Sequence, residues 1–328
     1  KTGDGDGIGV PTLGTLKRLP WLDRPTAQVY LHLTRDGKPW GYDPRAVLAG
    51  ILSRFAALKL TPVVAPELEF MLLSAERDEH GIPKLPSGGF NRGAGVGGQL
   101  MSIDAMLEFA DFLHDARQVC DSMGLGLETI VKELAPGQFE LNLHHVGDAL
   151  QAADNAQMLK RALKGVARRY GYLATFMAKP FPDLDGNGFH THVSVLDESG
   201  RNIFNDGTDE GSPRLRHAIA GLAESMPDLM LVFAPHRNSY RRFASGTHVA
   251  HAPTWAFDDR YVALRVPEGP PGSRRIEHRV AGADANPHLV LAAILAGVLY
   301  GLEHKLEAPD PEDDAADKGS GWMWWLGI

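Results

Sequence analysis

The sequence contains a single cysteine, Cys120, among its 328 residues. One cysteine excludes an internal disulfide and any metal site built on cysteine pairs. A lone free thiol is typical of a reducing compartment, so we expect a cytoplasmic location. Long apolar runs are also lacking. The longest, residues 289–302, falls short of the roughly 20 residues that cross a bilayer, so it predicts a buried helix and no membrane partner is expected.

Positive charge is scarce, because the formal net charge is −8. This balance argues against a general nucleic-acid-binding protein, and no nucleic-acid partner is expected. The sequence has no Walker loop and no kinase signature. The glycine-rich residues 93–98 lack the preceding apolar strand of a dinucleotide fingerprint and predict a surface loop. Residues 183–188 match half of a calcium loop, but its twelfth position is Ser194 instead of Glu, which argues against a calcium sensor.

The hydrophobic pattern predicts an α+β fold with antiparallel strands and long helices to one side. Helices are expected over residues 44–60, 102–123, 148–170, 213–226 and 286–302. Strands are expected over residues 27–33, 128–132, 139–143, 188–195, 261–266 and 275–280. Residues 61–73 predict either a strand pair or one long strand interrupted at Pro66.

Four glutamates are the first candidates for chemistry. Glu67 and Glu69 alternate with apolar residues, so a strand would place both carboxylates on one face. Two like charges this close are costly unless a cation neutralises them, although a strand edge that faces water would show the same pattern. Glu133 and Glu140 flank a turn at residues 136–137, which could bring both carboxylates to one place or could form a surface hairpin.

Two histidines show the same two-residue spacing. His190, His192 and Ser194 would share one face of a strand, with valines on the other face. Neutral imidazoles suit metal ligation or phosphate contact, whereas a lone histidine is more often a satisfied core or surface residue. The paired spacing favours a functional role.

Arginines concentrate near the end of the chain. They are Arg241, Arg242, Arg260, Arg265, Arg274, Arg275 and Arg279. Guanidinium groups are the preferred partners of carboxylate and phosphoryl groups, so this cluster predicts an anion site. Glu277 lies inside the cluster. Oxygen ligands, imidazoles and arginines without a glycine-rich phosphate loop suit ATP that is positioned through divalent metals for phosphoryl transfer.

Six segments, in order, resemble those of the glutamine synthetase superfamily. They are PELEF, ELAPGQFE, KPF with GNGFHTHVS, NSYRRF, RVP with RRIEHR, and ADANPHLVLAAILAG. The likeness is greatest to its γ-glutamyl-polyamine and γ-glutamyl-monoamine synthetase branch, and it extends over residues 40–309. It implies a catalytic domain at 41–328, a curved antiparallel sheet (a partial barrel) backed by helices, with its C-terminal helical part incomplete. Residues 1–40 would be a remnant of an N-terminal β-grasp domain.

The resemblance also implies a role for each candidate residue. One Mg²⁺ or Mn²⁺ ion would be held by Glu69, Glu133 and Glu140, and a second by Glu67, His190 and Glu277. Glutamate would contact Asp185, Gly186, Arg242 and Arg279. ATP, as a substrate, would contact His192, Ser194, Arg265 and Arg275. Arg260 would stabilise the transferred phosphoryl group, and Arg242 and Arg279 would take part in catalysis.

The implied activity is ATP-dependent ligation of glutamate to an amine. In glutamine synthetases a glutamate that helps to bind ammonium follows the NSYKR segment, but here the matching position is His248. This departure favours an organic amine as the partner of glutamate and ATP, with His248 as a candidate for the amine site. The alternatives are glutamine synthetase proper, which uses ammonia, and a non-catalytic relative that binds glutamate, an amine or nucleotide. Resemblance further predicts a homo-oligomer, a dodecamer of two hexameric rings.

Overall fold

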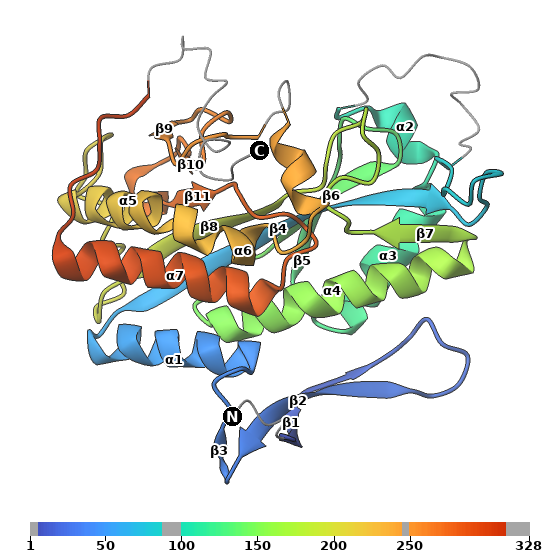
Figure 1. Ribbon diagram of the computed structural model, residues 1–328, viewed down its shortest axis with the longest axis horizontal. Coiled ribbons are helices and arrows are strands. Elements are labelled where there is room, and N and C mark those ends of the chain that lie inside the picture. Colours follow the sequence, from blue (N-terminus) through green and yellow to red (C-terminus); the bar gives the residue numbers. More distant parts are fainter. Residues whose placement is uncertain (1–5, 87–99, 245–248, 313–328) are drawn as a thin grey trace.

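The centre of the molecule is an eight-stranded sheet (Figure 1). The computed structural model describes residues 6–86, 100–244 and 249–312. The strands follow the order β5 (Leu127–Lys132), β6 (Gln138–Leu143), β4 (Thr61–Ser74), β8 (Phe189–Leu196), β11 (Ile276–His278), β10 (Leu264–Val266) and β9 (Trp255–Phe257), with β7 (Tyr172–Thr175) also paired to β4. The predicted antiparallel pairing holds for every pair of this sheet except β9 and β10, which run parallel. The sheet is therefore mixed, because the loop after β9 returns to the start of that strand instead of forming a hairpin.

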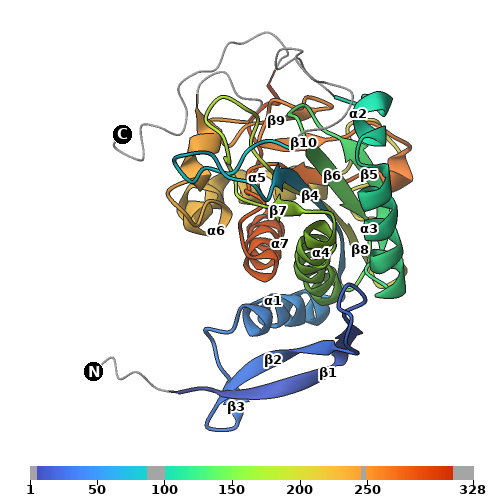
Figure 2. The ribbon, with the colours of Figure 1, turned by 90° about the vertical axis from the view of Figure 1, so that its right-hand side faces the viewer.

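Helices cover one face of this sheet. The helices of the described residues are α1 (Pro44–Ala57), α2 (Ile103–Leu107), α3 (Ala110–Ser122), α4 (Ala149–Arg169), α5 (Pro213–Ser225), α6 (Met230–Phe233) and α7 (Pro287–His304), with short 3-10 turns η1 (Pro227–Leu229), η2 (Ser239–Phe243) and η3 (Pro271–Ser273). Figure 2 shows α4 and α7 directly under the sheet and α1 beneath them. The predicted helix at 102–123 is broken into α2 and α3, because the backbone of Phe109 leaves the helical conformation.

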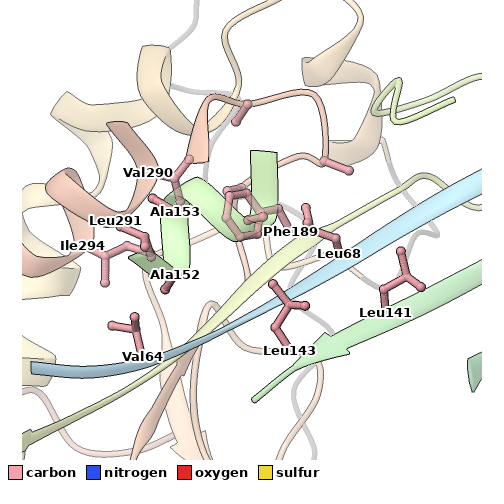
Figure 3. Packing of buried hydrophobic residues seen from close by; sticks show 14 of the residues in the cluster. Val64, Leu68, Leu141, Leu143, Ala152, Ala153, Phe189, Val290, Leu291 and Ile294 are labelled. Carbon is pink, nitrogen blue, oxygen red and sulfur yellow. The ribbon is translucent and has the colours of Figure 1, made fainter. Parts of the chain in front are cut away.

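The apolar core lies between the sheet and these helices. In Figure 3 the sheet contributes Val64, Leu68, Leu141, Leu143 and Phe189, and the helices contribute Ala152, Ala153, Val290, Leu291 and Ile294. Each of these side chains is buried, and burial of a leucine-sized side chain contributes about 1.5–3 kcal/mol. The apolar face of each strand is thereby fixed toward the helices, so the alternate residues of the same strands must face the other way.

Strand β4 is one continuous strand, so the predicted strand pair and the predicted interruption at Pro66 are both wrong. Pro66 lies opposite Thr191 of β8, inside an unbroken antiparallel register. Helix α7 confirms the buried helix predicted at 286–302. By length and composition it could cross a membrane, but 67% of its apolar window is buried inside the protein.

A separate three-stranded antiparallel sheet lies outside α1, formed by β1 (Ile8–Arg18), β2 (Ala27–Arg35) and β3 (Lys38–Pro39) (Figure 2). Strand β1 was not predicted, because its glycines hide the pattern of a strand. Trp21 in the β1–β2 connection packs on α4 at Gly165, where a Cβ atom would lie 2.4 Å from the indole Nε1. The assignment of this three-stranded sheet to a β-grasp domain stays a prediction.

Helices α5 and α7 cross at glycines, which gives a test of the packing. A Cβ atom on Gly301 would lie 1.9 Å from the carbonyl oxygen of His217, whereas a Cβ atom on Gly50 of α1 would meet nothing within 4 Å. We expect Gly301→Ala to lower the free energy of unfolding by about 2 kcal/mol or more, because the two helices must separate. Gly50→Ala should raise it by roughly 0.5–1 kcal/mol. Urea unfolding of both variants measures this, and equal stability would contradict the close crossing.

Candidate active site

Strand register gathers the predicted glutamates and histidines on the face of the sheet opposite the helices. Glu67 of β4 lies opposite His190 of β8, and Glu69 lies opposite Glu140 of β6. On the next strand, Glu277 of β11 lies opposite His192. Four neighbouring strands therefore each contribute acidic or imidazole groups to one patch, which we call the carboxylate cluster (Glu67, Glu69, Glu133, Glu140, His190 and Glu277).

The first half of the cluster is a buried trio of Glu67, His190 and Glu277. One ligand atom of each lies within 4.8 Å of the others. His190 Nδ1 lies 2.7 Å from Glu67 Oε1 and 3.8 Å from Glu277 Oε1. This is the trio that resemblance implied for one metal ion. Carboxylate oxygens and an imidazole are a donor set that suits Mg²⁺ or Mn²⁺.

The second half contains Glu69 and Glu140. With His190 they form another group whose ligand atoms lie within 4.8 Å of one another. Glu69 Oε2 accepts a hydrogen bond from the backbone N–H of Gly188 at 2.9 Å. Glu133 follows β5 and adds charge to this half without belonging to either compact group. Its place as a metal ligand stays a prediction.

Charges in the cluster are only partly balanced. Burial and the repulsion of Glu67 and Glu69 raise the pKa of Glu140 to about 10, and burial and Glu69 raise the pKa of Glu133 to about 7. For Glu67 burial acts in the same direction, but hydrogen bonds with His190 and His192 hold its pKa well below the ordinary value. The metal-free site therefore retains protons that a divalent cation would displace. This surplus of negative charge supports the fit of a cation.

Arginines surround Glu277. Arg265 Nη1 donates to Glu277 Oε2 at 2.9 Å, and Arg279 Nη1 donates to Glu277 Oε1. Burial would raise the pKa of Glu277, but Arg279 and the two histidines lower it below the ordinary value. Arg242 is buried and donates to the carbonyl oxygen of Val280 at 3.0 Å. Its electrostatic neighbours include Glu69.

A cavity of about 700 Å³ adjoins the cluster. It is lined by three of the four residues predicted to contact ATP, namely His192, Ser194 and Arg275. Arg275 Nε donates to His192 Nδ1 at 3.2 Å, and His192 Nε2 lies 3.4 Å from Glu67 Oε2. His192 therefore lies between the cavity and the buried trio. A larger hollow of about 1280 Å³ lies beside the end of α1 and contains none of the predicted site residues.

The remaining predicted residues are more scattered. Asp185 and Gly186 lie in the loop before β8, where a Cβ atom on Gly186 would come within 2.8 Å of Arg242 Cγ. Arg260 is exposed in the loop between β9 and β10. Arg274 lies apart from the carboxylates and donates to the carbonyl oxygen of Thr208 at 3.2 Å. His248, like the glycine-rich residues 93–98, lies outside the described residues.

Gln138 was not singled out from the sequence. Its amide nitrogen lies 3.3 Å from Glu69 Oε2 and donates to the carbonyl oxygen of Gly186 at 2.9 Å. The amide oxygen accepts from the backbone N–H of Ala135 at 3.1 Å. Gln138 thus joins the turn after Glu133, strand β4 and the loop before β8. The signal was available, because Gln138 faces the same side of its strand as Glu140.

Comparison with known proteins agrees with this fold. The family model for the glutamine synthetase catalytic domain matches residues 41–320. The chain therefore belongs to the glutamine synthetase family. Within that family, it is 40% identical over 305 residues to gamma-glutamylputrescine synthetase PuuA of Escherichia coli (strain K12). The aligned residues cover 93% of this chain and 65% of that protein.

Further relatives share this similarity. Glutamate–isopropylamine ligase of Pseudomonas sp is 32% identical over 312 residues, covering 92% of this chain and 65% of that protein. Among solved structures, a GmaS/ADP complex superimposes with a TM-score of 0.83 at 29% identity, covering 100% of this chain and 73% of that chain. The chain thus spans about 65% of the length of these two curated relatives.

The raised pKa values of Glu140 and Glu133 predict proton-linked metal binding. Glu140, with its pKa raised to about 10, holds a proton throughout pH 6–8, and Glu133, with its pKa raised to about 7, loses one there. A cation must displace these protons, so Mn²⁺ affinity should rise with pH, by about tenfold per pH unit for each proton released. Titration calorimetry at pH 6, 7 and 8 measures this. Glu140→Gln should reduce the slope by about one proton, and an affinity that does not change with pH would refute the linkage.

Proposed function

We propose that this protein is an ATP-dependent ligase that forms a γ-glutamyl amide from glutamate and an organic amine. The observation that carries the proposal is the buried trio of Glu67, His190 and Glu277, which lies beside a cavity of about 700 Å³ lined by His192 and Arg275. A metal site beside a cavity large enough for a nucleotide suits phosphoryl transfer, because that reaction needs positioning and positive charge more than covalent chemistry.

The preference for an organic amine rests on relatives. PuuA, at 40% identity, and the isopropylamine ligase, at 32%, are named for amine substrates, as is gamma-glutamylethanolamide synthetase GlnA4 of Streptomyces coelicolor, at 34% over 302 residues. The glutamine synthetase of Thermotoga maritima is also similar, at 31% over 313 residues. The higher identity with PuuA and the departure at His248 both support an amine larger than ammonia.

The proposed reaction has two steps. In the first, an oxygen of the γ-carboxylate attacks the γ-phosphorus of ATP, ADP leaves, and γ-glutamyl phosphate forms. Bound Mg²⁺ or Mn²⁺, held by the two halves of the carboxylate cluster, would supply positive charge next to the phosphates. Arg242 and Arg279 hold the glutamate, and Arg275 and His192 hold the nucleotide at the cavity. Arg260 stabilises the transferred group, which requires its exposed loop to approach the site.

In the second step the neutral amine attacks the acyl carbon, the C–O bond to phosphate breaks, and phosphate leaves. The nitrogen then gives up one proton to become an amide. Exclusion of water favours this step, because water would hydrolyse the acyl phosphate. The reaction consumes ATP and releases ADP and phosphate.

Phosphate release across a panel of amines tests the proposal. With ATP, Mg²⁺ and glutamate, we expect putrescine or ethylamine to support a higher kcat/KM than ammonia. Glu67→Gln should reduce the rate by at least about 100-fold, because it removes charge from the buried trio. Glu198→Gln is a matched control, since the side chain of Glu198 is 70% exposed and pairs with Lys59.

Each other outcome identifies an alternative. A higher kcat/KM with ammonia than with every organic amine would establish a glutamine synthetase. Absence of Mn²⁺ binding, together with absence of ADP release with any amine, would favour a non-catalytic relative.

A further inference from the structure

Lys160 is a buried lysine on the helix-covered side of the sheet. It belongs to α4 and is only 7% exposed. Its ammonium group donates to the carbonyl oxygens of Ala283 and Ala285, at 2.5 and 2.8 Å. Burial lowers its pKa to about 7. A buried lysine is costly, so its two bonds to one short loop call for an explanation.

That loop, residues 280–286, connects β11 to α7 and is a meeting point of backbone contacts. The N–H of Ala283 donates to the carbonyl oxygen of Asn187 at 3.0 Å, and the N–H of Phe189 donates to that of Ala281 at 2.8 Å. The 280–286 loop is thus bonded on both sides of Gly188, whose backbone N–H holds Glu69.

Both arginines proposed to bind glutamate depend on the same loop. Arg279 directly precedes it, and Arg242 donates to the carbonyl oxygen of Val280 at 3.0 Å. Ser239 begins the 3-10 turn that contains Arg242, and its hydroxyl donates to Asp284 Oδ2 at 2.6 Å. The two carbonyl groups held by Lys160 belong to the residues on either side of Asp284. Any shift of these carbonyls would therefore move the carboxylate that fixes the turn of Arg242.

We propose that Lys160 is a positioning residue for glutamate binding, which acts through the 280–286 loop from the opposite side of the sheet. It does not touch the substrate. It fixes the carbonyls of Ala283 and Ala285, the loop fixes Asp284 and Val280, and these fix the guanidinium of Arg242. The inference rests on the proposed function, because it takes glutamate as the ligand of Arg242 and Arg279.

A purely structural lysine would make a different prediction. Lys160 also lies over the rings of Phe176 and Phe189, at 5.8 and 5.7 Å, and these contacts contribute to packing. Loss of packing alone would lower stability and would weaken all ligands together. Loss of positioning would weaken glutamate selectively, because the loop bonds directly to Arg242 and its turn, whereas Glu277 and His192 are held by the pairing of β11 with β8.

Lys164 provides a matched control. It lies one turn further along α4, and its ammonium group is also 5.8 Å from the ring of Phe176. Among the bonds of the described residues, the loop carbonyls of Ala283 and Ala285 are bonded by Lys160 and not by Lys164. Lys160→Met and Lys164→Met therefore both remove an ammonium group and a similar ring contact. They differ in the two bonds to the loop and in burial, since Lys164 is exposed.

The test is calorimetric binding of L-glutamate, of ATP with Mg²⁺, and of Mn²⁺ to the full chain. Lys160→Met should weaken glutamate binding on the order of tenfold, because small displacements of positioning groups have effects of this size or larger. ATP and Mn²⁺ affinities should stay within about twofold. Lys164→Met should leave all three unchanged. A folded Lys160→Met protein that binds glutamate as tightly as the wild type, or that loses all three ligands equally, would overturn the inference.

Asp284→Asn tests the same route from the other end. It weakens the acceptor of the Ser239 hydroxyl and should also reduce glutamate affinity selectively, so it carries the test if Lys160→Met does not fold. Unchanged glutamate affinity in Asp284→Asn would then overturn the inference. A wild-type protein that binds ATP and Mn²⁺ but not glutamate would refute the proposed function and this inference with it. Normal glutamate binding in both the wild type and Lys160→Met would refute this inference alone.

Discussion

The register of β4 with its two neighbours is the constraint on which the site depends. Glu67 and Glu69 have their positions because Leu68 is held in the core on the opposite face. The same register brings His190 opposite Glu67 and Glu140 opposite Glu69. Apolar burial on one side of the sheet therefore fixes the positions of charges on the other side. The free energy that holds like-charged carboxylates together comes from the packing of the helices.

The two faces of the sheet are also linked at one end. The 280–286 loop connects β11, which carries Glu277 of the charged face, to α7, which packs on the apolar face. It receives bonds from Arg242 on the first side and from Lys160 on the second. This connection would let α4 influence Arg242 without contact between them, because the loop is bonded at several backbone positions.

Much of the site could be predicted, because two-residue spacing decides which side chains of one strand share a face. The spacing of Glu67 and Glu69 and that of His190 and His192 gave the correct faces. Spacing alone cannot tell which strands are neighbours, and the order of the family's segments supplied that step. The structure adds one detail, because His190 belongs to both compact groups of the carboxylate cluster, whereas the role of Glu133 as a ligand stays a prediction.

Other features could not be predicted, because they depend on tertiary contacts of single side chains. The parallel pairing of β9 with β10 arises from the path of one loop. The bonds of Gln138 and Lys160 join segments that are far apart in the sequence, so their partners do not follow from the pattern of their own elements. The arginine cluster divides for the same reason, since Arg274 turns away to Thr208 while Arg265 turns to Glu277.

The length of β4 has a further consequence. Alternate residues of this one strand line the cavity at Ala65, build the cluster at Glu67 and Glu69, and enter a second apolar group at Met71. A strand advances by about 6.6 Å for every two residues, so the residue spacing along β4 sets the distances between these three regions. Insertion or deletion of one residue would move the side chains beyond that point to the opposite face of the sheet. Exchange of side chains along β4 keeps this spacing, whereas a change in its residue count would not.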